Sequence, residues 1–88
     1  MQDAFDLTEL TAYLTQLAQA QGFLVDEVRI YDETQSKGDL YIQVVLLNTS
    51  KSPPVSTKFE VSVREVERVG VHAVDKLMAY ACSNLSAL

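Results

Sequence analysis

The sequence predicts an α+β fold in the order α-β-β-β-α, a three-stranded antiparallel meander with two helices packed on one face. Apolar residues recur at three- and four-residue steps before Gly22, which is typical of an amphipathic helix. Three strand-like segments follow, separated by residues that form turns. Helical spacing returns after Ser62. Because the connections are short, consecutive strands should pair and both helices should lie on the same face of the sheet.

Capping residues mark both ends of the first predicted helix. Asp6 has the position of an N-cap, with Glu9 three residues later as its capping-box partner. Gly22 can adopt the left-handed conformation that ends a helix, after which Phe23 can fold back onto it. The stripe expected to face the sheet consists of Leu7, Leu10, Leu14, Leu17 and Ala18.

Strands are predicted over residues 28–34, 39–48 and 55–61. A hairpin turn at residues 36–39 joins the first two, because Gly38 accepts a positive φ without steric cost. The loop at residues 48–54 contains two prolines, which cannot donate hydrogen bonds to a ladder. In the first and third strands apolar and polar residues alternate, so each has one apolar face.

The middle predicted strand is apolar on both faces, and this is the most informative feature of the chain. A strand in a small sheet with one side open to water should alternate between apolar and polar residues. Here one face would carry Leu40, Ile42, Val44 and Leu46, and the other Tyr41, Val45 and Leu47. We therefore expect another molecule to lie on the second face, since an 88-residue chain has little left to cover it.

The last predicted element is one long helix that starts with capping-box spacing between Ser62 and Glu65. Valines are poor helix formers, so a third strand that continues to Val71 is the alternative for residues 62–71. The spacing of the valines favours the helix. Gly70 within the apolar stripe predicts a close approach of backbones. The residues expected on the buried face are Val63, Val66, Gly70, Val74, Leu77 and Ala81.

Composition indicates a single compact domain over residues 1–88, with no cofactor. The hydrophobic content of 48% supports a core, and the single cysteine, Cys82, excludes an internal disulfide. The net charge is −5, and residues 1–33 hold seven acidic side chains against one arginine, a balance of −6. An acidic chain repels phosphate backbones, which disfavours nucleic-acid binding. No apolar run approaches the ~20 residues that cross a membrane, and the first residues lack the basic start of a signal peptide, so we expect a cytoplasmic protein.

Four side chains at four-residue steps would form a basic strip on the outer side of the last helix: Arg64, Arg68, His72 and Lys76. One interpretation is a site for anions or nucleic acid. The other is an ordinary solvated face, because Glu65 and Asp75 lie close enough to neutralise part of it.

The order of elements resembles that of double-stranded RNA-binding domains. Those domains place a lysine cluster at the start of the last helix, where it reaches phosphates across the RNA groove. In this chain Glu65 and Glu67 alternate with Arg64 and Arg68 in that region. The resemblance is therefore confined to architecture and implies no function and no site residue.

No residue pattern predicts catalysis or metal binding. His72 is expected to be exposed, without a thiol, hydroxyl or acid pair nearby in an obvious pocket, whereas general acid–base chemistry needs positioned partners. Cys82 is expected to be a partly buried and inert thiol. The four acids between Asp26 and Glu33 are spread along an extended segment and cannot converge on a cation, so we interpret them as charges that protect an edge strand from aggregation. We therefore expect a protein that is not an enzyme.

Three functions fit these observations. The first is an interaction module that forms a dimer, or binds a protein partner, through the helix-free face of the sheet. The second is nucleic-acid binding by the basic strip. The third is a regulator whose acidic residues 1–33 engage a basic protein surface. The residues predicted at the sheet-face interface are Tyr31, Tyr41, Val45 and Leu47, with Arg29, Gln43, Lys58 and Glu60 as its rim. The alternative for this face is that the long polar side chains cover the apolar ones.

Overall fold

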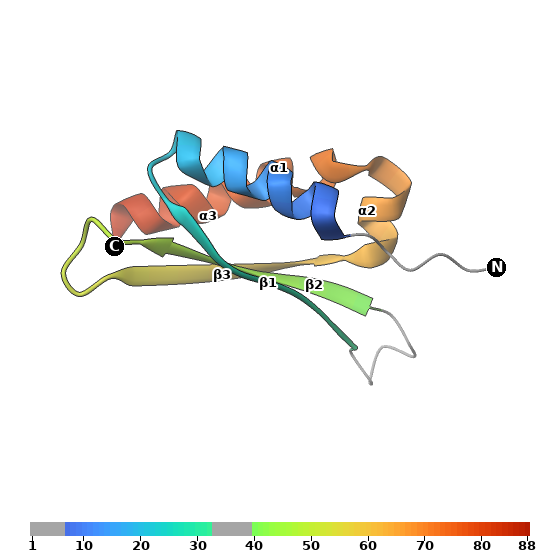
Figure 1. The fold of residues 1–88 in the computed structure, drawn as a ribbon, viewed down its shortest axis with the longest axis horizontal. Helices are drawn as coiled ribbons and strands as arrows, with labels where there is room; N and C mark the ends of the chain where they lie inside the picture. Colours follow the sequence, from blue (N-terminus) through green and yellow to red (C-terminus); the bar gives the residue numbers. More distant parts are fainter. Residues whose placement is uncertain (1–6, 33–39) are drawn as a thin grey trace.

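The structure is a computed structural model that describes residues 7–32 and 40–88. Figure 1 shows a layer of helices above a sheet. The elements in chain order are α1 (Leu7–Ala20), β1 (Leu24–Asp32), β2 (Leu40–Asn48), β3 (Val55–Ser62), α2 (Val63–Val69), the 3₁₀ helix η2 (Val71–Val74) and α3 (Asp75–Ala87). The predicted α+β class and order are confirmed.

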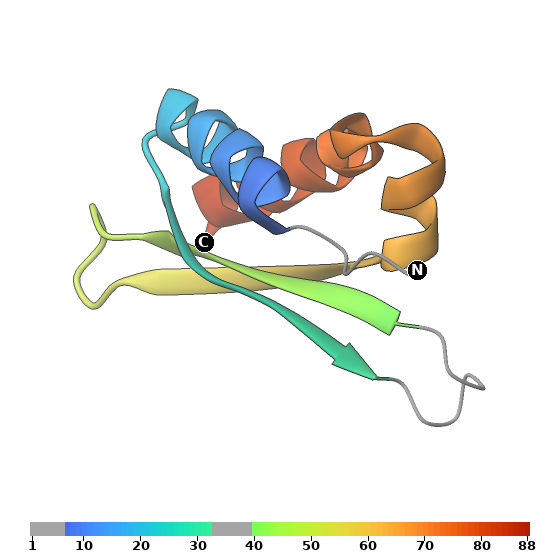
Figure 2. The same ribbon diagram turned by 45° about the vertical axis from the view of Figure 1, so that its right-hand side comes forward.

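The three strands form one antiparallel sheet in the order β1-β2-β3, which is the predicted meander. The helices lie on one face of it in both views (Figures 1 and 2). Among the strands, α1 contacts mainly β1 and α3 contacts mainly β3, so the two helices lie over opposite edges of the sheet. Within the described residues, no helix lies on the other face.

Helix α1 ends as its sequence predicts. Gly22 has a φ of +82°, and its N–H donates to the Gln19 carbonyl over 3.0 Å. The N–H of Phe23 donates to the Ala18 carbonyl over 2.9 Å, which completes a Schellman motif. Phe23 then enters the core beside Ala18. The predicted N-cap, Asp6, lies outside the described residues.

Strand β1 starts four residues earlier than predicted, because a β-bulge at Asp26 lies between two paired segments. Val25 pairs with Leu46 and Val28 with Val44, so both valines lie on the helix-covered face. In a regular strand, two residues three apart point to opposite faces. The extra residue of the bulge reconciles this spacing with a single core face. The predicted turn at residues 36–39 lies outside the described residues.

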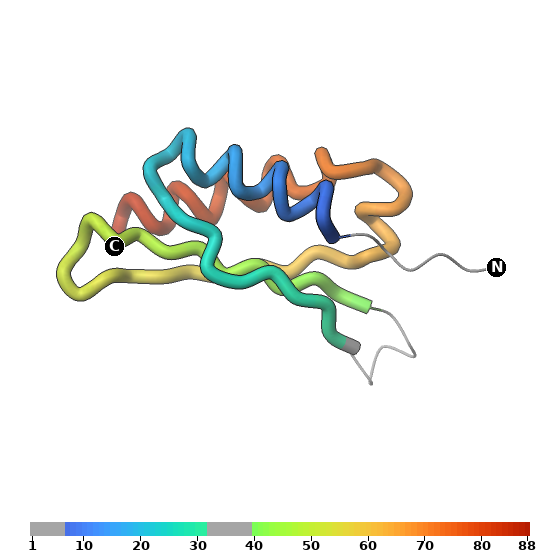
Figure 3. Tube along the Cα trace, viewed as in Figure 1, coloured from blue at the N-terminus to red at the C-terminus, as the bar shows by residue number. Residues whose placement is uncertain are grey.

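The predicted long C-terminal helix is wrong, because Gly70 breaks it (Figure 3). The Ser62 hydroxyl caps α2 as expected, accepting from the Glu65 N–H over 2.9 Å. Gly70 then has φ +92° and ψ −169°, a conformation that is nearly restricted to glycine. A Cβ built on Gly70 would meet nothing within 4 Å. Backbone conformation, and not the predicted close approach, therefore explains this glycine, and the strand alternative for residues 62–71 is also wrong.

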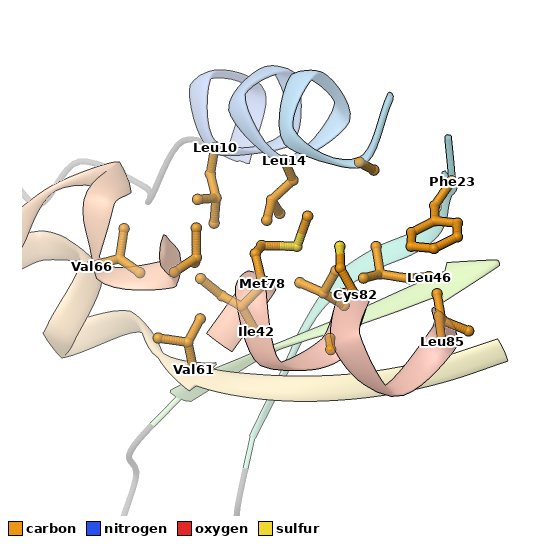
Figure 4. Close-up of a cluster of buried hydrophobic side chains, with 14 of the residues drawn as sticks. Leu10, Leu14, Phe23, Ile42, Leu46, Val61, Val66, Met78, Cys82 and Leu85 are labelled. Carbon is orange, nitrogen blue, oxygen red and sulfur yellow. The ribbon is translucent and has the colours of Figure 1, made fainter. Parts of the chain in front are cut away.

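The core lies between the helices and the sheet (Figure 4). Leu10 and Leu14 extend from α1 toward Met78 of α3. The central strand supplies the side chains beneath them, with Ile42, Val44 and Leu46 fully buried. The other buried apolar residues are Ala18, Phe23, Val61, Val63, Val66, Val74, Ala81, Cys82 and Leu85.

Candidate functional site

The helix-free face of the sheet presents four rows of side chains, which the strand register defines. The rows run from β1 through β2 to β3 and alternate with the rows that face the helices. In order along β2 they are Leu24–Leu47–Ser56, Glu27–Val45–Lys58, Arg29–Gln43–Glu60 and Tyr31–Tyr41–Ser62. All four predicted interface residues and all four predicted rim residues lie on this one face.

Apolar side chains lie at the two ends of this face. At one end the rings of Tyr31 and Tyr41 form a cross-strand pair with centroids 6.1 Å apart. At the other end Leu24 pairs with Leu47 and is 49% exposed. Leu24 was missed by the sequence reasoning, since the bulge at Asp26 hides its place in the alternation.

Charged and polar side chains occupy the middle of the face and cover it in part. The Arg29 Nε donates to the Gln43 Oε1 over 3.3 Å and lies 3.5 Å from the Glu27 carboxylate. Val45 lies in the neighbouring row and is half-buried, as are Tyr41 and Leu47. The long polar side chains thus contact one another over the central rows, and cover of the apolar side chains by them stays a prediction. The rows at the two ends contain no such side chain.

The face has a pattern that matches itself when it is reversed along the strands. Between the second and third rows lies the row Val28–Val44–Phe59, which points to the core. On either side of this row, Glu27 corresponds to Arg29 and Lys58 corresponds to Glu60. One step further out, Leu24 corresponds to Tyr31, Leu47 to Tyr41 and Ser56 to Ser62. Each charge therefore has its opposite at the mirrored position and each leucine has a tyrosine, whereas in the middle of β2 Val45 corresponds to Gln43.

The four residues of the predicted basic strip do not share one helix face. Arg64 and Arg68 belong to α2, His72 to η2 and Lys76 to α3, and Gly70 separates the first two from the others. Arg68 donates to the Glu65 carboxylate over 2.7 Å. Nucleic-acid binding by these residues stays a prediction, without the continuous surface on which it depended.

A cluster of three polar side chains joins α1 to the start of α3. The Tyr13 hydroxyl donates to the Asp75 carboxylate over 2.6 Å, and His72 Nδ1 lies 3.0 Å from each of these groups. The Tyr13 and His72 rings meet edge to face, with centroids 5.3 Å apart. The expectation that no hydroxyl neighbours His72 is therefore wrong. Sequence spacing gave no signal for Tyr13, which is 59 residues from His72, whereas Asp75 is only three residues away.

These contacts shift two pKa values in opposite directions. The hydrogen bonds from Tyr13 and, secondly, from His72 hold the pKa of Asp75 below its ordinary value. The hydrogen bond to Asp75 raises the pKa of the Tyr13 hydroxyl, because the bond is lost when the hydroxyl ionises. Both shifts therefore favour the pairing of a neutral tyrosine with an ionised aspartate.

A groove of about 400 Å³ runs between α1 and α3 beside this cluster. Its lining is mainly apolar on the α1 side, with Leu17 next to Tyr13, and its α3 side includes Met78 and Cys82. The Cys82 thiol is buried more fully than predicted, and burial raises its pKa. Among the described residues, no group of three or more His, Cys, Asp or Glu side chains could hold a metal ion.

Comparison with family models, with curated proteins and with solved structures gives no match. None of the helices formed by residues 7–32 and 40–88 has the length and apolar character to cross a membrane. The function must therefore be argued from the sheet face itself.

Proposed function

We propose that the chain is a non-enzymatic interaction module that self-associates through the helix-free face of its sheet. The observation that carries the proposal is the reversed match of the four rows about the Val28–Val44–Phe59 row. A two-fold axis across the strands at this row would place each side chain opposite its mirrored counterpart. Two-fold symmetry is the commonest arrangement in homo-oligomers, and it requires a surface that complements itself.

The apolar residues would meet at the two ends of such an interface. Leu24 and Leu47 of one copy would face Tyr31 and Tyr41 of the other. Contact between tyrosines and leucines buries apolar surface. Each Å² of apolar surface removed from water stabilises the interface by roughly 25 cal/mol. Aromatic side chains are enriched at interfaces for this reason. The symmetry produces this contact twice, once at each end.

The charged residues would pair in the middle of the interface. Glu27 of one copy would face Arg29 of the other, and Lys58 would face Glu60. The four charges sum to zero, although the whole chain carries −5. The face can therefore approach a second copy without local repulsion.

A two-fold axis along β2 is a poorer arrangement. It would also oppose unlike charges, because Glu27 would face Lys58 and Arg29 would face Glu60. However, it would place Leu24 against Ser56 and Tyr31 against Ser62, which leaves apolar groups against hydroxyls. The axis across the strands satisfies both the charged and the apolar residues.

The proposal is tested by the solution mass of Val45→Glu beside that of the wild type, measured by light scattering on a sizing column. The new carboxylate would be buried against Gln43 of the second copy and would compete with Glu60 of that copy for Lys58, which leaves one negative charge unpaired in the contact and costs several kcal/mol. We expect Val45→Glu to halve the mass. The matched control is Gln16→Glu, which adds the same charge to the exposed side of α1 and should leave the mass unchanged. A wild-type monomer, or a Val45→Glu mass equal to that of the wild type, would refute the proposal.

A further inference from the structure

The free edge of β3 is a second surface, separate from the sheet face. We propose that it pairs with β3 of another copy of the chain to extend the sheet to six strands. Among the residues that the structure describes, β3 pairs with β2 alone. Its outer backbone groups are thus available to a further strand.

The two edges of the sheet differ in their protection. Strand β1 carries the bulge at Asp26 and exposed acids at Asp26 and Glu27, features that discourage pairing at an edge. Strand β3 is regular over eight residues, and its register with β2 has no interruption. The two prolines precede it and do not interrupt it. An incoming strand would therefore find a continuous ladder at β3 and a disrupted one at β1.

The sequence of β3 is complementary to itself in charge when it is reversed about Phe59, and this identifies a second copy as the partner. An antiparallel pair of β3 strands centred on Phe59 would place Lys58 opposite Glu60 twice. Thr57 would lie opposite Val61, and Ser56 opposite Ser62. Opposite charges in directly facing positions stabilise a strand pair, whereas like charges destabilise it. A register centred on Lys58 would oppose two lysines and is therefore disfavoured.

Helix α3 adds apolar surface beside the same edge. It contacts mainly β3 among the strands, and its inner side lines the groove with α1 through Ala79, Ser83 and Ser86. A rotation of about 100° per residue then places Leu77 and Leu88 on the opposite side, with Tyr80 next to them. Tyr80 is 71% exposed and Leu88 57% exposed. When two β3 strands pair, the two α3 helices become neighbours, and these side chains would lie between them.

The two proposed interfaces are compatible with each other. The two-fold axis of the sheet-face contact lies parallel to the sheet and crosses the strands at the Phe59 row. The two-fold axis of the edge contact is perpendicular to the sheet and passes through the same row. Perpendicular two-fold axes that intersect generate a closed assembly of four chains. A chain with both contacts would therefore form a tetramer, and loss of either contact would leave a dimer.

Hydrogen exchange of the β3 amides tests the edge contact directly, in the Glu27→Lys variant that weakens the sheet-face contact. Alternate amides of an edge strand point away from the sheet and exchange readily unless another strand pairs with them. For a dimer that is mostly associated, the monomer fraction falls with the square root of concentration. We therefore expect the outward β3 amides to slow about tenfold for a hundredfold rise in concentration. The outward amides of β1 serve as the internal control and should not change.

A second variant tests the contribution of α3. Tyr80→Lys changes an exposed side chain and should not disturb the fold, but in the proposed assembly it would add a positive charge to each of the two neighbouring α3 helices. We expect it to halve the solution mass, whereas Gln16→Lys on α1 should not. Outward β3 amides that exchange at the same rate at all concentrations would overturn the proposal. Because this measurement reports on the β3 backbone, it decides the edge contact whether or not the sheet-face contact forms.

Discussion

Tyr13 and Asp75, 62 residues apart in the chain, share a hydrogen bond of 2.6 Å that ties the middle of α1 to the first residue of α3. His72 contacts both groups from η2. The cluster lies where the chain resumes its helix after the break at Gly70. It therefore joins α1 to the start of α3 at one end of the groove between the two helices.

Tyr13→Phe should lower stability in a manner that depends on pH. Asp75 has a lowered pKa in the folded chain, so its contribution is present above its unfolded value of 3.8 and is lost as the pH falls below it. Tyr13 has a raised pKa, so its contribution is present below its unfolded value of 10.0 and is lost as the pH rises above it. The difference in Tm between the wild type and Tyr13→Phe should be constant at intermediate pH and shrink at both extremes.

Thermal unfolding monitored by circular dichroism across this pH range measures that difference. Tyr80→Phe is the matched control, because Tyr80 is exposed and lies outside the cluster. Its Tm should match that of the wild type at every pH. A Tyr13→Phe difference that persists unchanged at low pH would show that the hydrogen bond to Asp75 does not stabilise the fold.

Gly70→Ala should destabilise the protein through its backbone alone. The φ of +92° and ψ of −169° place this residue in a region that costs an L-residue roughly 1–3 kcal/mol. Steric contact adds nothing, since no atom lies within 4 Å of the new Cβ. Urea unfolding would measure the loss. A chemically synthesised chain with D-alanine at position 70 should recover the stability, and failure to recover it would point to a clash and not to the backbone conformation.

Leu14→Ala should cost about 2–5 kcal/mol in the free energy of unfolding, because its side chain is fully buried between α1 and the sheet. Leu17→Ala is the matched control one turn away, where the side chain is only half-buried and borders the groove. The free energy of unfolding should fall clearly less in Leu17→Ala than in Leu14→Ala. Equal losses at the two positions would contradict the packing shown in Figure 4.

The Cys82 thiol should react slowly with alkylating or disulfide reagents at pH 8 while the chain is folded. It is 6% exposed, and burial raises its pKa, so few molecules carry the reactive thiolate. The rate should increase strongly in denaturant, where burial is lost. Met78→Ala, which removes a neighbouring wall of the groove, should increase the rate in the folded chain. A folded-state rate equal to the denatured rate would contradict the burial of this thiol.

Local sequence signals were sufficient to predict those elements in which the capping residues and the apolar periodicity indicate the same bounds. The stripe of α1 and the glycine at its end predicted both the buried face and the Schellman motif. The short connections predicted the antiparallel meander with helices on one face only. The side chains expected on the open face are there because alternation fixes the face of every residue once the register is known.

The remaining features depend on conformations that residue types do not reveal. The bulge at Asp26 adds one unpaired residue, which shifts the alternation and conceals the first two residues of β1. Gly70 occurs at a position where the apolar spacing continues through the break, so the pattern alone predicts an unbroken helix. The contact of Tyr13 with His72 and Asp75 follows from the angle between α1 and α3, which no local pattern encodes.

The measurement that tests the central claim most directly is the solution mass of a charge-reversal series on the sheet face. Glu27→Lys would oppose two cations, because Arg29 of the second copy faces it, and Arg29→Glu would oppose two anions. We predict that each single change lowers the mass and that the double variant Glu27→Lys/Arg29→Glu restores it. Glu27→Lys/Lys58→Glu carries the same net charge and should stay dissociated, since it restores the pairs only for an axis along β2. A series in which every variant keeps the wild-type mass, or in which the first double variant is not restored, would contradict the proposed interface.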